Sequence, residues 1–90
     1  MGRSAQRVGD LNLFGGPILT GDSSVQINGQ PAAVTGSIVG PHFPFTKLHL
    51  ISIAQGRSSV LVGGKPLVAT GDMDLCGHPR IGGSPDVQVG

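Results

Sequence analysis

The stretch "GDSSVQINGQPAAVTG", residues 21–36, recurs later in the same chain as "GRSSVLVGGKPLVATG", residues 56–71. The two copies lie 35 residues apart and are identical at eight of their sixteen positions. A shortened third copy, "GSPDVQVG", residues 83–90, places Val87 where Val25 and Val60 stand in the other two. Repeats of this period indicate one supersecondary unit per copy.

Each full copy predicts a β-hairpin. Val25, Gln26 and Ile27 alternate apolar and polar side chains, as a half-buried strand does. Asn28-Gly29 follows and favours a type I′ turn, because both central positions of that turn need a positive φ. In the second copy the same places are taken by Val60–Val62 and Gly63-Gly64. No stretch combines a helical period with caps, so the sequence predicts an all-β fold.

The segments between the copies also repeat. "GDLNLFGGPILTG", residues 9–21, matches "GDMDLCGHPRIGG", residues 71–83, at an offset of 62, and the middle connector, Gly36 to Gly56, is eight residues longer. Three related units favour a pseudo-threefold arrangement within one chain. A linear stack of three repeats is the alternative, but a short stack would expose two sheet edges.

Length predicts one small domain over residues 1–90. Its core must be thin, because the 90 residues include no Trp or Tyr, three Phe, 16 Gly and 7 Pro. A small domain of this kind needs a staple or a partner. The single cysteine cannot form an internal disulfide, so the staple must be a metal or another chain.

The charge excludes strong electrostatic attraction to two classes of partner. A formal net charge of +1 gives no strong electrostatic attraction to nucleic acid or to a membrane surface. No apolar run is long enough to span a bilayer. The first residues, "MGRSAQRVGD", lack the apolar core of a standard secretion signal.

Pro31-Ala32-Ala33, followed by Val34 instead of Arg, is close to the motif Pro-Ala-Ala-Arg. Together with "VGD" at residues 8–10, "TGDMDLCGHP" at residues 70–79 and the ending "GSPDVQVG", it makes the chain resemble the PAAR-repeat family. The resemblance covers nearly the whole sequence, so it implies a single domain over residues 1–90 without the extension or effector domain that some members carry.

The resemblance implies a cone-shaped β protein that caps a trimeric β-helical spike, VgrG-like or of a phage tail, as one chain per trimer. The spike belongs to a contractile injection machine, either a type VI secretion system or a contractile phage tail. A protein of this family would be made in the bacterial cytoplasm and then delivered outside the cell or built into a virion. It would meet the target membrane only transiently and bind no nucleic acid.

The resemblance also implies a structural zinc ion held by His and Cys near the sharp end. The chain offers four such ligands, a complete tetrahedral set: His42, His49, Cys76 and His78. Alternatives stay open for each element of this site. His49 lies in the apolar stretch "KLHLIS" and suits a neutral core histidine, Cys76 suits a small buried hydrophobe, and iron could replace zinc. The first connector places Phe14 and Gly16 opposite Cys76 and His78 and supplies no ligand.

The apolar members of the three copies are the candidate partner surface. They give each unit one apolar side, of which part should form the core and part a docking base: Val25, Ile27, Val60, Val62, Val87 and Val89. A passive structural tip without catalytic residues is therefore the predicted function. The alternatives are an adaptor that carries effector cargo, with the loop His42 to Lys47 as contact, and a small zinc hydrolase with an open coordination position.

Overall fold

A computed structural model describes residues 3–41, 52–75 and 77–89. Those residues form short strands and turns with no helix, as the sequence predicts, and hence no helix able to cross a membrane occurs among them. The strands are β1 (Arg3–Ser4), β2 (Asp22–Ile27), β3 (Gln30–Ala32), β4 (Ile38–Val39), β5 (Ser52–Ile53), β6 (Leu61–Val62), β7 (Lys65–Pro66) and β8 (Gln88–Val89).

The two predicted hairpins are confirmed. β2 pairs antiparallel with β3, and β6 with β7. Asn28 and Gly29 have φ values of 53° and 81°, and Gly63 and Gly64 have 59° and 81°. Both central residues of each turn therefore lie in the left-handed region, which is the requirement that selects Asn-Gly and Gly-Gly.

The counterpart of these hairpins in the third unit is a strand pair that joins the two ends of the chain, which sequence analysis did not foresee. β8 from the shortened copy pairs antiparallel with β1, with Arg3 opposite Val89. The sequence does hold a signal for this pairing. The segment that begins with the second strand of each hairpin, here called the return segment, occurs three times: "RSAQRVGD", residues 3–10, aligns with "QPAAVTGS", residues 30–37, and "KPLVATGD", residues 65–72.

These three return segments meet in a closed cycle of backbone hydrogen bonds. The amide of Gln6 donates to the carbonyl of Val68 at 2.9 Å, Val68 to Ala33 at 2.9 Å, and Ala33 back to Gln6 at 3.0 Å. All three residues are fully buried. Antiparallel bridges flank them in the same cyclic order: Ala5 with Ala69, Arg7 with Ala32, and Val34 with Leu67.

The three connectors form a second closed cycle. The returning arm of each connector pairs with the outgoing arm of the next: Ile18 with Val39, Ala54 with Asp74, and Arg80 with Asn12. Since no connector is left with an unpaired side in this cycle, the connectors brace one another instead of hanging free from the hairpins.

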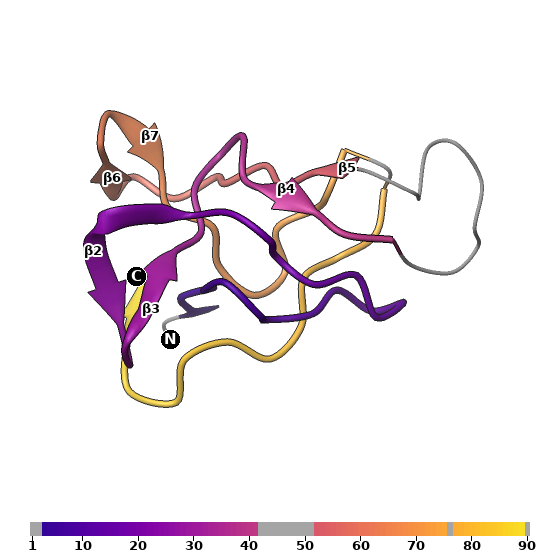
Figure 1. The fold of residues 1–90 in the computed structure, drawn as a ribbon, viewed down its shortest axis with the longest axis horizontal. Coiled ribbons are helices and arrows are strands. Elements are labelled where there is room, and N and C mark those ends of the chain that lie inside the picture. Colours follow the sequence, from indigo (N-terminus) through magenta and orange to yellow (C-terminus); the bar gives the residue numbers. More distant parts are fainter. Residues whose placement is uncertain (1–2, 42–51, 76, 90) are drawn as a thin grey trace.

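The molecule has unlike ends along its longest dimension, 32 Å against 25 and 21 Å across. β2, β3, β6 and β7 gather with both termini at one end, and β4, β5 and the connectors extend to the other (Figure 1). We call the end built from the hairpins β2–β3, β6–β7 and β1–β8 the base. The described connector residues, 9–21, 36–41, 52–56, 71–75 and 77–83, form the connector end.

The core has two apolar clusters. The cluster on the side of the base comprises Ala5, Ile27, Ala32, Val34, Val62, Leu67, Ala69 and Val89. The cluster on the side of the connector end comprises Ile18, Ala33, Val39, Ala54 and Val68. The remaining interior of the connector end is polar, because Gln6, Asn12, Asp74 and Arg80 are also fully or almost fully buried.

Candidate functional site

Each connector begins with a turn that a hydrogen-bonding side chain closes. Asp10 Oδ2 accepts the amide of Arg7 at 2.8 Å, and Asp72 Oδ2 accepts the amide of Ala69 at 3.0 Å. Ser37 Oγ serves in the middle connector, where it accepts the amide of Val34 at 3.0 Å. The matched aspartates are therefore turn residues, which is the structural role that their recurrence predicts.

The turn that carries two candidate metal ligands is tightly built. The amide of Asp74 donates to the carbonyl of His78 at 2.9 Å, and the amide of Gly77 donates back to the carbonyl of Asp74 at 2.8 Å. Gly77 has a φ of 93°, a conformation in which a side chain is strained. His78 is half-buried there.

Phe14, at the corresponding turn of the first connector, packs on this histidine. The ring centroids of Phe14 and His78 are 4.1 Å apart with the planes inclined by 38°. By the repeat alignment Phe14 occupies the place of Cys76. The first connector thus contributes an apolar wall beside His78, in agreement with its lack of a ligand.

Of the four predicted zinc ligands, the structure places His78 alone. His42, His49 and Cys76 lie outside the described residues. Within residues 3–41, 52–75 and 77–89 no three His, Cys, Asp or Glu side chains come together as a metal site. The four-ligand zinc site and the choice between zinc and iron stay predictions, and so does the cargo contact at His42 to Lys47.

A buried ion pair flanks the turn that carries His78. Arg80 Nη1 lies 2.9 Å from Asp74 Oδ2, and both side chains have 0% exposure. Asn12 Nδ2 also donates to Asp74 Oδ2, at 2.8 Å. The other carboxylate oxygen, Oδ1, is buried and accepts no hydrogen bond from the described residues.

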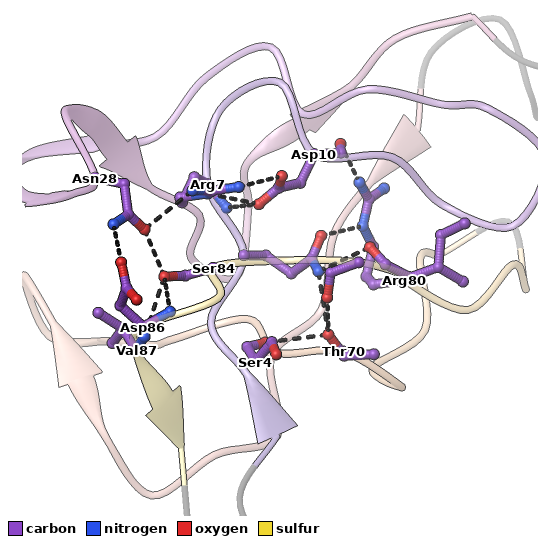
Figure 2. A network of polar contacts seen from close by, with 12 residues as sticks. Ser4, Arg7, Asp10, Asn28, Thr70, Arg80, Ser84, Asp86 and Val87 are labelled. Carbon is purple, nitrogen blue, oxygen red and sulfur yellow. Dashed lines mark hydrogen bonds and ion pairs between the residues drawn. The ribbon is translucent and has the colours of Figure 1, made fainter.

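The remaining donors of Arg80 bind across the molecule. They reach the backbone carbonyl of Asp10, the carbonyl of Gly16 at 3.2 Å and Gln6 Oε1 at 3.3 Å. Figure 2 shows Arg80 reaching toward Asp10 from the third connector. One guanidinium therefore ties the third connector to the first.

Sequence analysis missed Arg80, although the repeats held a signal. At the offset of 62, Arg80 aligns with Ile18 and Asp74 with Asn12. A cation and an anion at positions whose counterparts are apolar or neutral indicate a pair that faces inward, because either charge alone would be costly to bury.

The candidate partner residues divide into two layers at the base. Ile27, Val62 and Val89 are buried together in one apolar cluster. Val25, Val60 and Val87 are exposed, and so is Leu61 of β6, at 60%. The three exposed valines are thus the members of the predicted set that a partner can touch.

A polar network fastens the β2–β3 turn to the segment before β8. Asn28 Nδ2 donates to Asp86 Oδ2 at 3.0 Å, and Asn28 Oδ1 accepts from Arg7 Nη1 at 3.0 Å and from Ser84 (Figure 2). Hydrogen bonding to the Asp10 carboxylate raises the pKa of Arg7. The network stabilises the closure of the chain at the base.

An open polar notch lies beside β2 and β7. Its lining includes Thr20, Asp22, Ser37 and Lys65, with no histidine or cysteine. Hydrogen bonds from the hydroxyl and amide of Ser24 hold the pKa of Asp22 below its ordinary value.

Comparison with known proteins gives one positive result. A search of curated proteins found no match to the chain. A family model described as PAAR motif matches residues 8–82, which include both full repeats and the first two connectors. The chain therefore belongs to the PAAR motif family.

Proposed function

We propose that this chain is the structural tip that caps and sharpens the trimeric β-helical spike of a contractile injection machine. The PAAR motif is associated with the spike tips of such machines, and proteins that carry it sit on spike proteins. The observation that carries the proposal is the pair of closed cycles, in which three return segments pair in rotation and three connectors do the same. A chain with pseudo-threefold symmetry can match all three subunits of a trimer at once.

The base is the docking surface in this proposal. Val25, Val60 and Val87 are exposed at corresponding positions of the three units, each two residues before a member of the buried trio Ile27, Val62 and Val89. Exposed apolar side chains at an end formed by short hairpins suit an interface, and the strand edges beside them can accept added strands. The stoichiometry that follows is one chain per trimer.

The connector end is the free point and holds the metal. The ligands would be His42, His49, Cys76 and His78, and zinc would supply a structural cross-link with no open position. The environment of the described ligand fits this role. His78 is half-buried under Phe14, and Asp74 Oδ1, at the root of the turn, is a buried acceptor suited to the N–H of a metal-bound histidine.

Docking is tested by measuring the mass of the complex with the cognate spike by native mass spectrometry. We expect one chain per trimer for the wild type and no complex for Val87→Asp, because a carboxylate would be desolvated at the interface. The matched control is Leu13→Asp, which places the same charge on an exposed residue of the connector end and should leave docking intact.

Two results would contradict the proposal. A complex of three chains per trimer would show that a single chain does not match all three subunits of the spike. Loss of docking by Leu13→Asp with retention by Val87→Asp would show that the molecule sits on its spike in the opposite orientation.

A further inference from the structure

The first and third connectors carry buried polar side chains directly beside exposed apolar ones. In the first connector Asn12 is fully buried, whereas its neighbours Leu11 and Leu13 are exposed. In the third connector Asp74 and Arg80 are buried, whereas Leu75 and Ile81, the residues that follow each of them, are exposed. Leu13 and Leu75 expose 56% and 57% of their surface. A half-buried strand in water shows the opposite pattern.

Charged groups are withdrawn from this surface. The described residues of the connector end include four charged side chains: Asp10, Asp72, Asp74 and Arg80. Each forms an ion pair: Asp10 with Arg7, Asp72 with Arg3, and Asp74 with Arg80. The side chains of these four residues are 0–14% exposed. The exposed charges Arg57, Lys65 and Asp86 lie in the segments that build the hairpins.

The backbone of the connector turns is also satisfied internally. The amide of Asn12 donates to the carbonyl of Gly16 at 2.9 Å, and that of Gly15 to the carbonyl of Asn12 at 3.1 Å. The third connector has the same two bonds between residues 74 and 78. Peptide groups that already have partners cost less to remove from water, which is the condition for any backbone that enters hydrocarbon.

We propose that the outer surface of the connector end binds the hydrocarbon of a lipid bilayer spontaneously, without the force of the machine. The surface consists of Leu11, Leu13, Phe14, Leu19, Leu75 and Ile81. Lipid is the occupant because these side chains come from the paired first and third connectors, whose described residues expose no charged side chain that could supply the polar rim of a protein interface. The inference rests on the proposed function in one respect, namely that this end leads.

The test is flotation of the full, metal-loaded chain with vesicles of zwitterionic phosphatidylcholine. The wild type should float with the vesicles. The double variant Leu13→Gln/Leu75→Gln should lose about tenfold in partitioning, because two half-exposed leucines supply much of the apolar contact. The matched control is Leu61→Gln, which changes an equally exposed leucine at the base and should float like the wild type.

The proposal fails if the wild type does not float, if Leu61→Gln loses as much as the double variant, or if binding needs anionic lipid and disappears in salt. It also fails if sedimentation shows that the surface joins two copies of the chain. Equal thermal melting curves establish that the variants are folded. Val87→Asp should still float while it fails to bind the spike, so that failure of this inference is distinguishable from failure of the proposed function.

Discussion

Replacing Arg80 with methionine is expected to destabilise the domain by about 3–5 kcal/mol, a large part of the 5–15 kcal/mol typical of a whole domain. The substitution keeps most of the side-chain volume but leaves the Asp74 carboxylate buried and without its cation. It also removes the bonds from Arg80 to the first connector. Urea unfolding followed by circular dichroism measures the loss.

The control for this prediction comes from the repeats themselves. The double variant Arg80→Ile/Asp74→Val installs the apolar types found at Ile18 and Val39, the corresponding positions of the other connectors. It should recover at least half of the lost stability, because no charge remains buried. Asn12 Nδ2 and Gln6 Oε1 each lose a hydrogen-bond partner in this variant, so recovery should be incomplete. Equal stability of Arg80→Met and the wild type would contradict the importance of the pair.

Removal of zinc is expected to unfold or nearly unfold the chain. A structural zinc ion contributes on the order of 10 kcal/mol in small peptides, comparable with the stability of an entire domain of this size. Elemental analysis should find about one zinc per chain, and calorimetry with a chelator should show a large fall in the melting temperature. Cys76→Ser should lower the melting temperature in the same way.

Leu75→Ser is the matched control, since it makes a similar change one residue away on an exposed side chain that is no metal ligand. It should retain zinc and melt near the wild-type temperature. A folded protein without metal, or one that contains iron, would refute the zinc prediction.

The conformational preferences of neighbouring residues were sufficient to predict the turns of the two hairpins. Asn28-Gly29 determined a turn because few dipeptides accept two positive φ values, and the structure confirms it. The pairing of β1 with β8 escaped the same reasoning, since no turn joins strands at opposite ends of the chain. Recognition of it required alignment of residues 3–10 with the other return segments.

The interior of the connector end was harder to predict for a physical reason. Arg80 is an arginine in a Gly-rich turn region, which ordinarily indicates a solvated side chain. Its burial depends on Asp74 six residues earlier and on carbonyls of the first connector, contacts that arise only when the connectors pair. For the metal site, sequence supplied the ligand types, and the described structure adds the surroundings of His78 but no coordination geometry.

The pairing of β1 with β8 has a consequence for the order of events during synthesis. Arg3 pairs with Val89, which lies almost the whole length of the chain away, so the β1–β8 pair cannot form until β8 has left the ribosome. Until then the apolar cluster that includes Ala5, Ile27 and Val62 lacks Val89 of β8 and stays partly exposed to water. Folding of this domain should therefore wait until β8 has been synthesised and be all-or-none, and a nascent chain stalled before β8 should remain open to protease throughout.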